Sequence, residues 1–269
     1  MRLTFLSLQI IVFMGWLLAA HSRADSDNLF GKNKETQGES ALMGIFYDLK
    51  QTQDRKPITM DHPAYFKAIE DFVNGGWDES ILNKYYRSST PLYTTQFMLA
   101  SIPSEMAPKA FGVDKYCQGG FWLAHYKGQV TPPKDGTYRF VGWSDCQIVV
   151  AVNGKLALVA SYWKDKPMLN VSCERAASAF YPGGEGLKAG PWFDMKASEP
   201  VDLDVLWGDN GGICSCFLLV QEKGANYALD SGGYPILPVF QVAPYNTPDL
   251  PATEPLKFSH TPSVWRAWQ

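Results

Sequence analysis

The most constraining feature of this sequence is a long stretch, from Gly119 to Glu222, in which apolar side chains recur at every second residue. Successive side chains of a β-strand point to opposite faces, so this period predicts strands with one buried face. Val201–Trp207 shows the pattern most clearly, with four apolar residues on one face and two aspartates on the other. The chain is therefore expected to be mainly β, with antiparallel strands.

Turn signals divide this stretch into strands. Asn153-Gly154 supplies the two positive-φ residues of a type I′ turn and predicts a hairpin. Its core-facing residues are expected to be Ile148, Val150, Val152, Leu156 and Leu158. Across the glycine-rich segment 208–212, the sequence predicts that Val201–Trp207 pairs with Ile213–Val220.

The part of the chain before Gly119 contains the helical signals. Asp61 can cap a helix that has Pro63 in its first turn, and apolar residues then recur at helical spacing until Gly75-Gly76. Trp77, Ile81 and Tyr85 predict a second short helix. A strand is expected just before these helices, over Gly44–Leu49.

The N-terminus has the pattern of a secretory signal peptide, 1–24. Arg2 precedes an apolar run, and Ser22-Arg23-Ala24 places small residues where cleavage would leave Asp25 as the first residue. The alternative is an uncleaved signal anchor, although the run is short for a membrane span. We expect a secreted, periplasmic or cell-surface protein with no membrane span after signal cleavage. Residues 25–41 are mostly polar and are interpreted as a flexible tether.

The C-terminal segment, 225–269, contains many prolines, which prevent regular strand pairing. A disordered tail is one interpretation. The segment also carries many large apolar residues, including Trp265 and Trp268, so we expect an extended strap packed on the domain. The five cysteines, Cys117, Cys146, Cys173, Cys214 and Cys216, allow at most two disulfides, and buried thiols or long-range bridges are both compatible with their spacing.

Composition and motifs exclude several functions. The formal net charge of −3 offers no basic excess for nucleic acid. Catalytic signatures are missing, because Gly142-Trp143-Ser144-Asp145-Cys146 fails the nucleophile-elbow pattern at its last residue and the histidines are scattered. No catalytic residue is therefore predicted, and the protein is not expected to be an enzyme.

Two segments resemble the anthrax protective-antigen domain family, also called the PA-fourteen domain. The first is the run Tyr126–Phe140, followed by Ser144-Asp145 and Val150–Gly154. The second runs from Pro200 to Val220 through Asp209-Asn210-Gly211-Gly212. The resemblance implies an antiparallel β-sandwich or barrel over 42–224, with a partly helical insertion at 61–110.

In sugar-binding members of that family, two adjacent aspartates and an asparagine from a nearby loop hold Ca²⁺, which orders sugar hydroxyls. Asp145 matches the first aspartate, and Asn210 is placed to supply the loop ligand. Cys146 stands at the second aspartate, and a thiol is a poor ligand for this hard cation. We therefore expect no tight calcium site and no other cofactor.

The resemblance implies a secreted, non-catalytic binding module whose partner is a glycan or a cell-envelope component. The ligand is expected at the loops that follow Phe140 and Trp207, and the predicted contacts are Trp143, Asp145, Trp207, Asp209 and Asn210. Sugars stack on aromatic rings, and Trp143, Trp163, Trp192 and Trp207 all lie near predicted strand ends. The alternatives are a structural or assembly module of the cell envelope without a ligand site and, third, a glycosidase-type enzyme.

Overall fold

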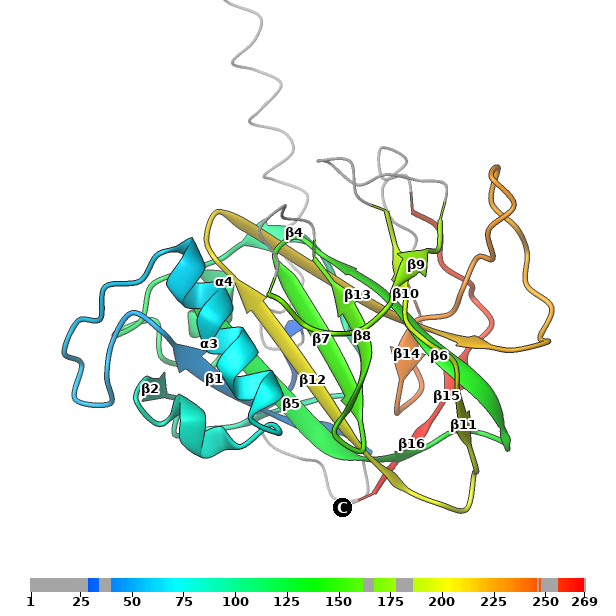
Figure 1. Ribbon diagram of the computed structural model, residues 1–269, viewed down its shortest axis with the longest axis horizontal. Coiled ribbons are helices and arrows are strands. Elements are labelled where there is room, and N and C mark those ends of the chain that lie inside the picture. The colour runs from blue at the N-terminus through cyan, green and yellow to red at the C-terminus, as the bar shows by residue number, and fades with distance from the viewer. Residues whose placement is uncertain are drawn as a thin grey trace, which may run out of the picture.

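The computed structural model describes residues 29–33, 40–161, 167–177, 186–245, 247 and 256–268. In this part of the chain, two mainly antiparallel sheets stack as a β-sandwich with few helices (Figure 1). The predicted fold class is confirmed. No helix within the described residues is long and apolar enough to cross a membrane, and the predicted signal peptide lies outside them.

The first sheet has the strand order β2-β1-β5-β12-β7-β8, with β3 added beside β1 and β16 beside β5. Long strands form its centre, and β12 lies between β5 and β7. The bounds of its strands are β1 Leu42–Asp48, β2 Tyr86–Arg87, β3 Leu92–Thr94, β5 Trp122–Thr131, β7 Gln147–Val152, β8 Lys155–Ala160, β12 Val201–Asp209 and β16 Arg266–Trp268.

The second sheet has the order β4-β13-β6-β10-β9, with β11 paired to β6. Its strands are β4 Met98–Pro103, β6 Gly136–Ser144, β9 Glu174–Arg175, β10 Lys188–Ala189, β11 Phe193–Met195 and β13 Ile213–Glu222. A short parallel pair, β14 Phe240–Gln241 with β15 Ser263–Val264, lies outside both sheets. The main core fills the space between the sheets, where Val150 and Val205 of the first sheet meet Phe140 and Leu218 of the second.

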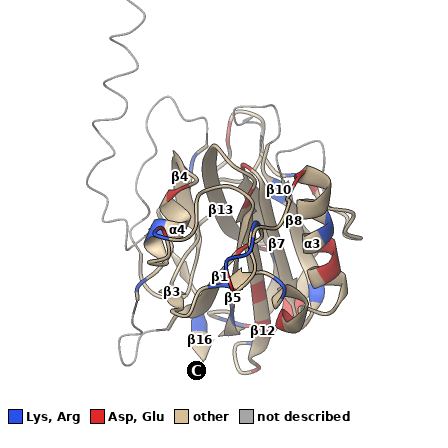
Figure 2. Ribbon diagram, turned by 90° about the vertical axis from the view of Figure 1, so that its left-hand side faces the viewer, with Lys and Arg blue, Asp and Glu red and all other residues tan. Residues whose placement is uncertain are grey.

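The second core cluster lies on the outer face of the first sheet, under helix α3, His62–Asn74 (Figure 2). The Asp61 side chain caps α3 by accepting from the Ala64 N–H, and the helix ends at Gly75, as its sequence predicts. Burial of the α3 face that carries Phe66, Ile69 and Phe72 fixes the helix on the sheet. The second predicted helix is only a 3₁₀ turn, η1 Glu79–Leu82, and a short helix α4, Met106–Ala110, follows β4.

A charged cluster ties η1 to the sheet beneath it. His125 of β5 is buried, with Nε2 2.8 Å from Asp204 Oδ1 and Nδ1 3.5 Å from Glu79 Oε1. Glu79 also binds Lys127 at 2.6 Å, and Arg87 lies 3.9 Å away. The His125 contact first, and then Lys127, outweigh burial and lower the pKa of Glu79 to about 2. Burial opposes the charged imidazole, but Asp204 and Glu79 outweigh it and raise the pKa of His125.

This cluster predicts a stability optimum in mild acid. Glu79 contributes stability above its unfolded pKa of about 4.5 and loses that contribution as the pH falls toward 2, whereas His125 contributes below about 6.5 and loses its contribution as the pH rises through its folded value. Glu79→Gln is expected to cost about 2 kcal/mol at pH 6 and to flatten the acid limb of the stability profile. Urea unfolding between pH 2 and 9 measures this profile. Glu199→Gln, in an exposed pair with Lys196, is the control and should leave the profile unchanged.

The β7–β8 hairpin forms at Asn153-Gly154, and both residues have positive φ, 49° and 72°. Ile148, Val150 and Leu158 face the main core as predicted. Leu156 was expected there but packs toward the cluster under α3. The reason is a register shift, in which Val150 opposes Leu158 while the next residue, Ala151, opposes Leu156.

The predicted pairing of Val201–Trp207 with Ile213–Val220 is wrong. β12 pairs with β5 and β7 in the first sheet, whereas β13 pairs with β4 and β6 in the second. The glycine-rich segment between them is therefore a crossover between sheets and not a hairpin turn. Both strands alternate, but alternation identifies a buried face and not the neighbouring strand.

Residues 29–33, which lie in the segment predicted to be a flexible tether, contact the domain. The Phe30 ring is 1% exposed and stacks on Trp207 at a centroid distance of 4.8 Å. The backbone of Lys32 pairs with that of Tyr93 through two hydrogen bonds. A single aromatic residue in a polar stretch thus anchors the chain in the main core.

The described parts of the segment 225–269 are extended and lie against the domain. Leu237, Val239, Leu256 and Phe258 are buried on the outer face of the second sheet. β16 then returns to pair with β5 of the first sheet. The chain therefore crosses from one sheet to the other at its C-terminal end (Figure 1).

Candidate functional site

Four chain segments meet at one end of the sandwich. β4 ends at Pro103 and β6 at Ser144, β12 ends at Asp209, and the segment Gly119-Gly120 leads into β5. The segments are close, because a Cβ at Gly120 would lie 3.2 Å from the Asn210 carbonyl oxygen. This end contains Asp145, Cys146, Asp209 and Asn210, and we call it the loop end.

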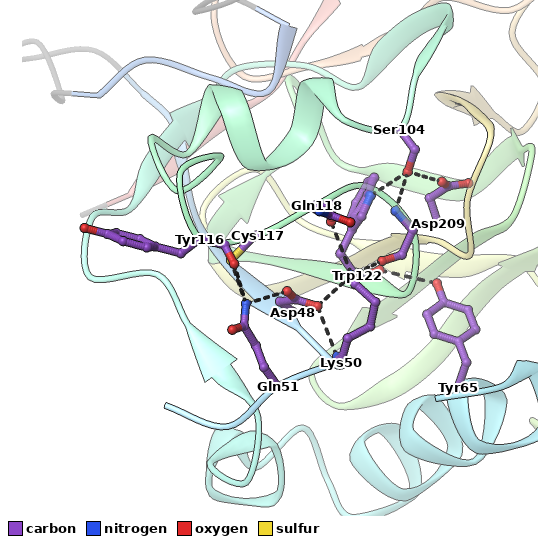
Figure 3. A network of polar contacts seen from close by, with 11 residues as sticks. Asp48, Lys50, Gln51, Tyr65, Ser104, Tyr116, Cys117, Gln118, Trp122 and Asp209 are labelled. Carbon is purple, nitrogen blue, oxygen red and sulfur yellow. Dashed lines mark hydrogen bonds and ion pairs between the residues drawn. The ribbon is translucent and has the colours of Figure 1, made fainter. Parts of the chain in front are cut away.

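Ser104 is the centre of a buried hydrogen-bond network at the loop end (Figure 3). Its hydroxyl donates to Asp209 Oδ2 and accepts from Trp122 Nε1 and the Gly120 N–H, each at 2.9 Å. The Gly211 N–H also donates to Asp209 Oδ2, at 3.0 Å. The network joins the ends of β4 and β12 to the start of β5.

Ser104→Ala is expected to destabilise the domain by about 2 kcal/mol, because Trp122 Nε1 and the Gly120 N–H lose this acceptor and Asp209 Oδ2 loses one of its two donors. Ser144→Ala is the matched control, since its buried hydroxyl makes one hydrogen bond among the described residues, to the Ser215 carbonyl oxygen at 3.1 Å, and should cost about 1 kcal/mol. Urea unfolding of both variants at pH 7 measures the difference. Equal losses would contradict the central role of Ser104.

A second network, also visible in Figure 3, holds the segment before β5 against β1. Lys50 pairs with the buried Asp48 at 2.7 Å and donates to the carbonyl oxygens of Gln118 and Gly120. Gln51 Nε2 donates to the other Asp48 oxygen at 2.8 Å. The backbone of residues 118–120 is thereby fixed beside the loop end.

The carboxyl groups at the loop end have raised pKa values. Burial raises the pKa of Asp145 to about 6. Burial also raises the pKa of Asp209 to about 7, against the hydrogen bonds from Ser104 and Gly211, and the nearby Asp145 charge adds to the increase. The structure thus brings these predicted residues together, with Asn210 next to Asp209.

Two polar atoms at the loop end have no hydrogen-bond partner within the described part of the chain. They are Asp209 Oδ1, an acceptor, and Asn210 Nδ2, a donor. Buried polar atoms in folded proteins nearly always have a partner. An unpaired acceptor and an unpaired donor on consecutive residues are therefore the feature of this end that most needs an explanation.

Residues 113–180 match the family model of the PA14 domain. This segment of the chain is similar to the PA14 domain. The matched segment contains β5, β6, β7 and β8 with the Asp145-Cys146 turn, and the resemblance seen in the sequence is confirmed. No curated protein matches the chain.

The chain is also similar to solved PA14 domains and adhesin domains. The PA14 sugar-binding domain from an RTX adhesin is 14% identical, with 71% of this chain and 94% of that chain covered and a TM-score of 0.44. The PA14 domain of the MpAFP antifreeze protein is 13% identical, with 72% and 89% covered and a TM-score of 0.41. The epithelial adhesin 6 A domain from Candida glabrata, solved in complex with Galb1-3GlcNAc, is 8% identical, with 76% and 94% covered and a TM-score of 0.42.

The loop end does not fit the calcium ion that the resemblance to the PA14 domain implies. The Cys146 thiol is fully buried, burial raises its pKa, and it lies beside the Tyr65 hydroxyl and the Asn210 backbone N–H. Ca²⁺ takes about six to eight oxygen ligands. Over the described ranges, no group of three or more His, Cys, Asp or Glu residues is arranged to hold a metal ion. The absence of a tight calcium site stays a prediction.

Two of the predicted ligand contacts offer no ring face. Trp207 is 1% exposed and lies between Phe30 and Trp122, and Trp143 is 2% exposed on the outer face of the second sheet, beside Phe217. Both rings are packed inside the domain, so neither can stack on a sugar in this structure. Their strand positions are as predicted, but the sequence does not show which segments cover them.

The raised pKa values of Asp145 and Asp209 raise the question of the third interpretation, a glycosidase-type enzyme. Such enzymes use two carboxyl groups that both reach the substrate. Asp209 is fully buried and one of its oxygens is bound by Ser104 and Gly211. Two cavities of about 370 and 410 Å³ lie elsewhere, beside the C-terminal strap, and neither is lined by Asp145 or Asp209. The buried Asp209 carboxyl is not placed to reach a substrate in this structure.

Proposed function

We propose that this domain binds glycans outside the cytosol, through the loop end and without calcium. The observation that carries the proposal is the pair of half-buried polar side chains at this end, the Asp145 carboxyl and the Asn210 amide, which lie beside the buried Asp209. Sugar hydroxyls both donate and accept, so they complement such a pair. The similarity to the PA14 family supports glycans as the ligand class.

Preformed loops make the loop end suitable for recognition. Ser104 and Lys50 fix the backbone around it through buried bonds, so little ordering cost remains on binding. Specificity would come from direct hydrogen bonds, because the Cys146 thiol takes the place of a calcium ligand. A fixed polar site of this kind discriminates by the positions of hydroxyl groups.

A glycan array tests the proposal with the wild type, Asp145→Ala and Asn210→Ala. Both substitutions are expected to reduce every bound signal at least tenfold. Asp202→Ala is the matched control, since this exposed aspartate lies near the opposite end of β12, and it should bind as the wild type does. Glycan binding untouched by both loop-end substitutions would place the site elsewhere.

Calcium calorimetry tests the second half of the proposal. Titration of the wild type with CaCl₂ is expected to show no tight site, and the array pattern should be the same in EDTA. Micromolar calcium affinity would overturn the metal-free mode of binding.

The packed interior of this end favours the second candidate, a structural module of the cell envelope. Trp143, Trp207 and Asp209 are all buried, which is what a module without a ligand would need. This candidate would be favoured if the folded wild-type protein bound no glycan on the array and if added glycans left its unfolding transition unchanged.

A further inference from the structure

The outer face of the second sheet is covered over most of its area. The C-terminal strap and the segment around Ala176 and Leu187 bury the central residues, among them Val141 and Leu219. Trp192 lies at the end of the sheet opposite the loop end, where β11 pairs with the start of β6. This residue immediately precedes β11, and 36% of its surface is exposed.

An arginine holds the Trp192 ring in place. The Arg139 guanidinium carbon lies 4.4 Å from the ring centroid. Arg139 is itself fixed, because its Nε donates to Gln221 Oε1 at 2.7 Å on the neighbouring strand and its Nη1 pairs with Glu174. Its side chain is only 12% exposed. The ring is therefore an anchored aromatic surface and not a freely rotating side chain.

Polar groups that suit sugar hydroxyls surround this ring. The Glu174 side chain is 68% exposed and offers carboxylate oxygens. Asp194, two residues after Trp192, is exposed and accepts from the Thr137 hydroxyl at 2.6 Å. An aromatic ring beside fixed carboxylates, an amide and a guanidinium is the combination that binds a pyranose, whose C–H face stacks while its hydroxyls form hydrogen bonds.

The charges at this surface favour a neutral sugar. Arg139 is paired with Glu174, so its positive charge is already balanced. Asp194 adds a negative charge that would repel a uronic or sialic acid. The fit is therefore to a neutral pyranose unit of an oligosaccharide.

We propose that Trp192, with Arg139, Glu174 and Asp194, is a second glycan-contact surface, specific for neutral pyranoses and distinct from the loop end. This inference rests on the proposed glycan-binding function and deepens it. A domain with contacts at both ends of the sandwich can hold a polysaccharide at two points, and two linked contacts give a higher overall affinity than either alone.

The test uses ¹⁹F NMR of protein labelled with 5-fluorotryptophan, titrated with cellohexaose, laminarihexaose, chitohexaose and the neutral glycan with the strongest array signal. The resonances of Trp192 and Trp268 are assigned from the Trp192→Phe and Trp268→Phe variants. Trp268 is the matched control, because it is 37% exposed and lies 4.0 Å below Arg266, but its Nε1 is bound to Thr131. At least one neutral sugar is expected to move the Trp192 resonance and leave that of Trp268 in place.

Affinity measurements complete the test. Trp192→Ala is expected to reduce the affinity for that sugar at least tenfold, and Trp268→Ala less than twofold. Both variants should unfold at the wild-type temperature. A sugar that binds with Trp192 unmoved, and as tightly to Trp192→Ala as to the wild type, overturns this inference and leaves the loop end intact. The opposite result is that the sugar still moves the Trp192 resonance while Asp145→Ala and Asn210→Ala bind it as tightly as the wild type does. That result overturns the loop-end site instead. No binding by any neutral sugar overturns this inference, and the glycan array, which includes charged glycans, then decides the loop-end site separately.

Discussion

Val150→Asp is expected to destabilise the domain by more than about 4 kcal/mol at pH 7. Val150 is fully buried at the centre of the first sheet, opposite Val205 on one side and Leu158 on the other. A carboxylate there would lie in the main core without a partner, so the variant would lose its stability or bind a proton. Urea unfolding followed by tryptophan fluorescence measures the loss, which should become smaller as the pH falls.

Two variants of the same hairpin make this result specific. Lys155→Asp, at an exposed position next to the turn, should change stability by less than about 0.5 kcal/mol. Leu156→Asp should cost less than Val150→Asp, because the register shift moves Leu156 out of the main core to a half-buried position. If Val150→Asp unfolded like the parent, the assignment of the buried face would be incorrect.

The sequence predicts best those elements whose signals are local. The Asp61 cap, Pro63 in the first turn and the two glycines determine where α3 begins and ends, and the structure agrees. Asn153-Gly154 is equally local, because a two-residue turn with two positive φ angles admits few other sequences. Neither signal depends on distant parts of the chain.

The prediction of which strands pair over long range was wrong, for a physical reason. β12 and β13 are adjacent in sequence and both alternate, yet they belong to different sheets. A register shift after Val150 then turned one residue, Leu156, to the opposite face. Period-two alternation carries no information on either point, because each depends on how the whole sandwich closes.

At the candidate site, too, part could be predicted from the sequence and part depended on long-range packing. Loops that follow adjacent alternating strands were expected to converge, and Asp145, Asp209 and Asn210 do lie at one end. Ser104 was missed, because no spacing links it to residues more than 100 positions away in the sequence. The burial of Trp143 and Trp207 was also missed, since distant segments pack in their clusters: Phe30 stacks on Trp207, and Phe258 packs on Phe217 in the cluster that contains Trp143.

The second large effect is expected for Phe30→Ala, which should cost about 3–5 kcal/mol. Phe30 packs on Trp207, Trp122 and Phe111, and its carbonyl oxygen accepts from the Tyr126 hydroxyl at 2.8 Å. Truncation leaves a cavity in the middle of this aromatic cluster. Thermal and urea unfolding measure the loss, and Asn33→Ala, three residues along and exposed, should have no effect.

Phe30→Ala also decides what Trp207 does. If the Phe30 ring covers Trp207, the variant loses stability, but at temperatures where it remains folded its glycan affinity equals that of the wild type. If residues 25–41 instead form a flexible tether, the substitution changes neither stability nor fluorescence, and the Trp207 ring is open to solvent. In that case Trp207 would regain its predicted role as the aromatic surface for a sugar at the loop end. The stability measurement therefore separates a core tryptophan from a ligand-binding one before any sugar is tested.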